Sequence, residues 1–99
     1  MALYQEELEI KKKREKIDRI INHTVMGEAY ILSPALEWKK VVIKSFHKIH
    51  DGEWTVMQLV DHLEEIGIRF GQAKSLIQYP IRECLRYIAK VSNKTLRNI

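Results

Sequence analysis

Glycine and proline are scarce in this chain, and their scarcity limits it to folds with few turns. The 99 residues include only four glycines and two prolines, too few for the many turns of an all-β domain. Between them, apolar residues recur three and four positions apart, which is the period of an amphipathic helix. Hydrophobic residues make up 45% of the chain and charged residues 30%, a balance typical of globular proteins. The sequence therefore predicts a mainly α protein with a single core.

The few helix-breaking and helix-capping residues predict where the helices lie. Pro34 suits the first turn of a helix, and Gly52 ends it. Thr55 is a good N-cap for the next helix, which Gly67 closes. Pro80 should divide the last apolar period, because a proline inside a helix costs about 3 kcal/mol. The predicted helices span residues 3–23, 34–50, 55–66, 71–78 and 80–91. Their apolar positions predict a core of Trp38, Val42, Phe46, Ile49, Val56, Leu59, Val60, Leu63, Ile81, Leu85 and Ile88.

The sequence favours a cytoplasmic protein that is not bound to a membrane. Its one cysteine, Cys84, cannot form an intrachain disulfide, which suits a reducing compartment. The first residues soon turn polar and charged, unlike a signal peptide. No apolar run approaches the roughly 20 residues of a membrane span.

The motifs of catalysis and of metal binding are missing from the sequence. It contains no glycine-rich phosphate loop, no nucleophile elbow and no His-Glu-x-x-His helix. His47 and His50 are three residues apart, a spacing that suits a metal, but no third ligand is suitably spaced. We therefore expect no enzyme activity, no metal and no cofactor.

Positive charge is concentrated in the last third of the chain. Residues 25–68 carry a net charge of −3, whereas residues 69–99 carry +6, with Glu83 as their only acid. A basic segment of this kind is typical of a surface that binds DNA phosphates, although such charges also serve simply to keep a surface solvated. Arginine and glutamine can read guanine and adenine edges, and lysine can hold phosphates. The candidate DNA-binding residues are Gln72, Lys74, Gln78, Tyr79, Arg82, Arg86, Tyr87, Lys90, Lys94 and Arg97.

The order of the elements resembles the winged helix-turn-helix superfamily of DNA-binding domains. The resemblance rests on the segment 49–56 (Ile-His-Asp-Gly-Glu-Trp-Thr-Val), on the helix that runs to Gly67, and on the spacing of apolar residues at 81, 85 and 88. The dipeptide Tyr79-Pro80 is similar to the start of the recognition helix in PadR-like regulators. The resemblance implies a winged helix-turn-helix-like domain over residues 34–99, with a recognition helix in the major groove of double-stranded DNA. The protein would then be a small transcriptional regulator.

Two features leave alternatives to this winged domain open. The stretch 67–78 is longer than the usual turn, so either a helix is inserted there or Gly71 begins a kinked recognition helix. Residues 91–96 can form a short hairpin around Asn93-Lys94 as a wing, or they can continue the last helix. A plain helical bundle and a helix-turn-helix variant without a wing are the alternative folds.

The N-terminal residues 1–24 predict a helical extension that serves as a dimerisation arm. Apolar residues fall on one stripe of this helix, and such a stripe is normally buried against another element. We expect a homodimer, held by an isologous contact between the two arms. It would present two recognition helices about one DNA turn apart. The stripe consists of Leu3, Ile10, Ile17, Ile20 and Ile21.

A different class of function is compatible with the same helices. The protein can be an adaptor or inhibitor that binds another protein and no DNA, because a fold does not determine a function. The surfaces that bind the partner protein would then be the mixed-charge N-terminal helix and the acidic helix that carries Asp61, Glu64 and Glu65.

Overall fold

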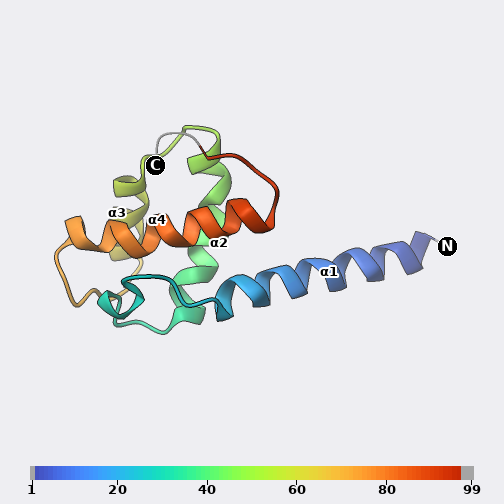
Figure 1. The fold of residues 1–99 in the computed structure, drawn as a ribbon, viewed down its shortest axis with the longest axis horizontal. Helices are drawn as coiled ribbons and strands as arrows, with labels where there is room; N and C mark the ends of the chain where they lie inside the picture. The colour runs from blue at the N-terminus through green and yellow to red at the C-terminus, as the bar shows by residue number, and fades with distance from the viewer. Residues whose placement is uncertain (1, 97–99) are drawn as a thin grey trace.

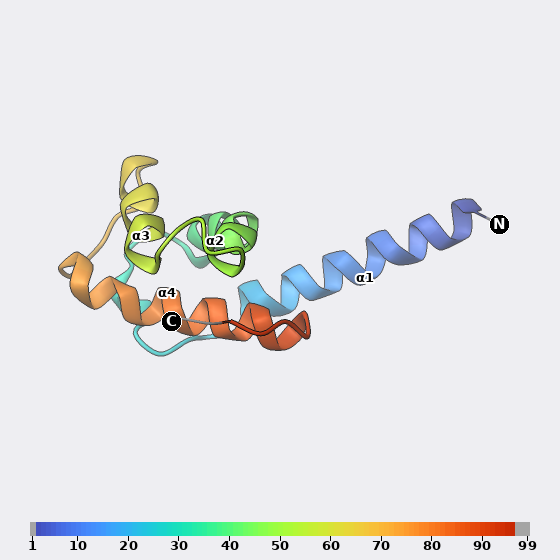
Figure 2. The same cartoon turned by 90° about the horizontal axis from the view of Figure 1, so that it is seen from above.

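The protein is a bundle of three helices from which a fourth, N-terminal helix projects (Figures 1 and 2). The computed structural model describes the backbone of residues 2–96 and the side chains of residues 9–96. The elements are α1 (Ala2–Asn22), the short 3-10 helix η1 (Glu28–Tyr30), α2 (Ala35–His50), α3 (Val56–Glu65) and α4 (Lys74–Val91). Both views show the C-terminal part of α1 beside α2 and α4, while its N-terminal part extends away from the bundle.

The first three predicted helices are confirmed to within about two residues at each end. Thr55 explains why α3 begins where it does: its side chain accepts a hydrogen bond from the Gln58 amide at 3.2 Å, and the Gln58 side chain accepts one from the Thr55 amide at 2.7 Å. This reciprocal capping box satisfies two amides that the helix leaves without partners. Every residue of the predicted core is buried.

The prediction that Pro80 divides the last helix is wrong. A single helix, α4, continues through Pro80, whose ring is fully buried. The ring faces Gly27, where a Cβ atom would lie only 3.1 Å from Pro80 Cδ. Burial of the ring against this glycine offsets the cost of the missing N–H. Residues 74–78 of the predicted helix 71–78 are therefore the first part of α4, whereas residues 71–73 lie in the loop before it.

The winged helix-turn-helix fold predicted for residues 34–99 is also wrong. Through residue 96 the chain forms no β-strand, so a wing is absent from the described part of the chain. Asn93 instead adopts a left-handed conformation, with φ 53°, and ends α4. The Asn93 and Lys94 amides donate to the carbonyls of Lys90 and Ala89, at 3.3 and 2.9 Å, as in a Schellman motif. The fold is a mainly α bundle with an N-terminal helical extension.

Hydrogen bonds between two loops fix the position at which α4 begins. Ile31 and Phe70 form an isolated antiparallel bridge. The Leu32 amide donates to the Arg69 carbonyl at 2.8 Å, and the Arg69 amide donates to Ser33 Oγ at 2.8 Å. The eight residues 66–73 between α3 and α4 are therefore held in place, although they are longer than the three or four residues of a helix-turn-helix turn.

Candidate functional site

The long helix α4 has one buried face and one exposed face. Ile77, Ile81 and Leu85 lie in the core, as does Pro80. The opposite face carries a row of polar and basic side chains spaced three and four residues apart, which places them on one side of a helix. In order along α4, these are Tyr79, Arg82, Arg86 and Lys90. We call this row the α4 stripe.

The α4 stripe carries only weak internal ion pairing. Arg86 donates to Glu83 at 2.7 Å, but both side chains are about half exposed, and such pairs contribute little to stability. Arg82 is half-buried and donates to Gln78 Oε1 at 3.1 Å. Lys90 is exposed and forms no ion pair with the residues whose side chains are described. The cationic groups of the α4 stripe are therefore available to bind an anion outside the protein.

The first turn of α4 is electrically neutralised by α3. Lys74 lies 2.8 Å from a carboxylate oxygen of Glu64 and 3.2 Å from one of Asp61. These two hydrogen bonds raise the pKa of Lys74 above its ordinary 10.5, and the bond to Glu64 has the larger effect. Gln72 is exposed in the loop before the helix. The positive charge predicted at the start of α4 is thus balanced, and the unbalanced charge lies toward its C-terminal end.

Three other candidate DNA-binding residues lie at or beyond that end. Tyr87 is half-buried and stacks on His23, with ring centroids 3.7 Å apart and ring planes 5° apart, so it joins α4 to the end of α1. Lys94 is exposed just after α4. Arg97 lies outside the described residues.

The predicted dimerisation stripe on α1 is divided into two parts. Ile20 is buried in the core of its own chain, and Ile17 and Ile21 are half-buried there. The prediction that Ile20 lies at a contact between subunits stays a prediction, although nearly all of its side chain is already covered within its own chain. Ile10 is 53% exposed. The side chain of Leu3 lies outside those that the structure describes.

Sequence reasoning missed Lys39, which is the most buried charged residue described, with 1% of its surface exposed. Its ammonium group donates to the carbonyl oxygens of Ile21 at 3.0 Å and His23 at 2.6 Å, and it forms an ion pair with Glu28. A cation suits this place, because the carbonyls at the end of a helix carry partial negative charge. Lys39 thus joins the end of α1 to α2 and η1.

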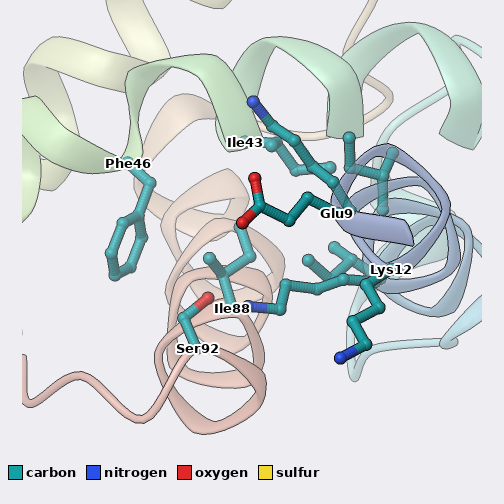
Figure 3. Close-up of a pocket in the computed structure, with 10 residues that line it drawn as sticks. Glu9, Lys12, Ile43, Phe46, Ile88 and Ser92 are labelled. Carbon is teal, nitrogen blue, oxygen red and sulfur yellow. The ribbon is translucent and has the colours of Figure 1, made fainter. Parts of the chain in front are cut away.

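A groove lies where α1 leaves the bundle. It has a volume of about 470 Å³, and its floor is apolar, with side chains from three helices. Figure 3 shows Ile43 and Phe46 of α2 facing Ile88 of α4, and Ser92 just after α4, across it. A smaller hollow of about 220 Å³ adjoins it on the other side of Ile17 and Ile43. The two hollows are bordered by Lys12, Lys13, Lys16, Lys40 and Lys44. We call these two hollows together the lysine-rimmed groove.

An exposed apolar cluster lies at the other end of α4. Met26, Tyr30, Leu76 and Tyr79 line a hollow of about 260 Å³, and Met26 is 84% exposed. Side chains of these types are enriched at protein–protein contacts.

Comparisons of the chain with models of protein families, with curated proteins and with solved structures give no match. In the described part of the chain, none of the helices combines the length and apolar character needed to span a bilayer. Among the same residues, no cluster of three or more His, Cys, Asp or Glu side chains is placed to hold a metal ion.

Proposed function

We propose that this protein is a small DNA-binding regulator that contacts double-stranded DNA through the exposed face of α4. The observation that carries the proposal is the α4 stripe, a continuous row of polar and basic side chains on a helix whose other face forms the core. Tyr79 and Lys90 are 11 residues apart on the helix, a length of roughly 16 Å. A helix surface of this size fits the major groove of B-DNA. The single cysteine supports a cytoplasmic location.

The residues of the α4 stripe and two residues near it, Gln78 and Lys94, suit different contacts. Arg82 and Gln78 are already hydrogen-bonded to each other, and their side chains match guanine and adenine edges, respectively. Arg86, Lys90 and Lys94 lie farther along the chain and suit phosphates, which position a protein on DNA without reading its sequence. Lys74 and Tyr87 are left out of the proposed contacts, because Lys74 is neutralised by α3 and Tyr87 is stacked on His23.

The salt dependence of duplex binding tests this proposal. Fluorescence anisotropy with a labelled random duplex should show an affinity that falls steeply with salt. Arg86→Ala and Lys90→Ala should each reduce the slope of log affinity against log salt by about one unit, since each removes one phosphate contact. Lys11→Ala is the matched control, because Lys11 is an exposed lysine on α1 that lies outside both the stripe and the lysine-rimmed groove. Absence of binding at low salt, or an equal effect of Lys11→Ala, would remove the support for the proposal.

A second candidate function, a protein-binding adaptor, is favoured by the exposed apolar cluster around Met26 and Leu76. DNA contacts do not require apolar side chains on the surface, whereas a protein partner would bury them. The acidic face predicted for this role on α3 is partly used within the chain, because Asp61 and Glu64 bind Lys74. The double variant Met26→Gln/Leu76→Gln, which adds no charge, separates the two functions: it should leave the salt slope of a DNA-binding protein unchanged and should abolish binding to a protein partner.

A further inference from the structure

The N-terminal part of α1 has the composition of a binding segment. Residues 2–8, which we call the acidic arm, contain Glu6 and Glu7 and no basic residue, together with Leu3, Tyr4 and Leu8. The arm is the part of α1 that extends away from the bundle in both views (Figures 1 and 2). A helical segment with this mix of apolar and acidic side chains gains stability when its apolar residues are buried against a partner.

The lysine-rimmed groove has the opposite properties. Its floor is formed by apolar side chains of α1, α2 and α4, including Ile17, Ile43 and Phe46. Five lysines and one acid, Glu9, border it, and none of the lysines forms an ion pair with the residues whose side chains are described. A segment that fills this groove should therefore carry both apolar and acidic side chains.

The acidic arm cannot fill the groove of its own chain. Helix α1 is continuous from Ala2 to Asn22, and the groove is lined by residues of that same helix from Glu9 onward. A helix without a break cannot turn back on itself, and α1 contains no glycine or proline at which it would kink. The arm of a second copy has no such restriction.

We propose that two copies of the chain form a symmetric dimer in which each acidic arm lies in the lysine-rimmed groove of the other copy. The two α1 helices then run antiparallel, so that Glu6 and Glu7 of one copy approach the lysines of the other. The contact is isologous, as is usual in twofold dimers. Seven helical residues span about 10 Å, which is shorter than the stretch of α1 that borders the groove, from Glu9 to Ile20. This assembly leaves the α4 stripe uncovered and does not depend on DNA binding.

A charge-swap experiment tests the exchange of arms. Variant one carries Glu6→Lys/Glu7→Lys, and variant two carries Lys13→Glu/Lys16→Glu. Sedimentation should give the parent a mass twice its 11.7 kDa, while each variant alone should be a monomer, with its dimer dissociation constant raised by at least ~100-fold through like-charge repulsion. An equimolar mixture of the two variants should regain the dimer mass, because each arm then meets a groove of opposite charge.

The control is Glu53→Lys/Glu65→Lys, which reverses two exposed acids outside the arm and should leave the dimer intact. A monomeric parent, a dimeric variant one or two, or a mixture of the two that stays monomeric would each overturn the proposal. Loss of folding cannot imitate the expected result, because only correctly folded variants would associate when mixed. The DNA-binding proposal is tested separately by the salt slope, so either proposal can fail without the other.

Discussion

Replacing Lys39 with methionine is expected to lower the free energy of unfolding by about 3–5 kcal/mol, the usual cost of removing one partner of a buried ion pair. The ammonium group of Lys39 has three partners, the carboxylate of Glu28 and the carbonyls of Ile21 and His23. Its loss leaves all three without compensation at a part-buried junction, where Lys39 is 1% exposed and Glu28 is 22% exposed. For a domain of this size, a loss of about 3 kcal/mol lowers the melting temperature by at least about 12 °C. Urea unfolding followed by circular dichroism measures the change.

The neighbouring lysine provides a matched control for this substitution. Lys40 is exposed, so Lys40→Met should change the unfolding free energy by less than about 0.5 kcal/mol. The double variant Glu28→Gln/Lys39→Met should recover part of the loss, because it no longer leaves a carboxylate without its cation. Equal stability of the Lys39→Met protein and the parent would contradict the role that we assign to Lys39.

The thiol of Cys84 is expected to be almost inert in the folded protein. Burial raises the pKa of Cys84 from an ordinary 9.0 to about 12, with a smaller opposing effect of the Lys39 ammonium group. The thiolate is the reactive form, so at pH 8 a rise from 9.0 to about 12 reduces its population roughly 1,000-fold. The reaction rate should increase about tenfold per pH unit above pH 8 and should not level off until the pH nears the raised value.

A thiol-reactive chromophore measures this protection. The native protein at pH 8 should react at least ~1,000-fold more slowly than the urea-unfolded chain. The same shift should make the fold less stable at high pH: a thiol whose folded-state pKa is raised contributes its full stability below the unfolded pKa, and this contribution is lost as the pH rises toward 12. Complete labelling of the native protein within minutes at pH 8 would show that Cys84 is not in the core.

The sequence predicted the core well because its helices have clear boundaries. Thr55 and Gly67 bracket α3, Pro34 and Gly52 bracket α2, and the apolar positions between them follow the helical period. Where the apolar period and the helix-capping residues indicate the same boundaries, local preferences and tertiary packing favour the same structure.

The predictions failed where one local signal has two structural meanings. Asn93-Lys94 is compatible in sequence with a hairpin turn or with a continued helix, but asparagine also adopts the left-handed conformation that ends a helix, as it does after α4. Pro80 was interpreted as a helix start, and the burial of its ring against Gly27, which allows it to lie inside α4, is visible only in the folded chain.

The site was predicted in part. The basic character of α4 could be read from the sequence, but the neutralisation of Lys74 by Asp61 and Glu64 depends on how α3 and α4 pack. Lys39 did carry a sequence signal: it lies three residues before Val42 and seven before Phe46, on the apolar face of α2. A lysine at such a position indicates a buried partner.

The central claim, that the exposed face of α4 binds double-stranded DNA, can be tested residue by residue with a single NMR titration. A duplex of about 20 base pairs is added to isotopically labelled protein, and the backbone amide shifts are followed. The account predicts that the largest changes fall between Tyr79 and Lys94, with little change in α3. It would be contradicted if no amide shifted at low salt, or if the changes were confined to the apolar cluster around Met26 and Leu76 or to the lysine-rimmed groove.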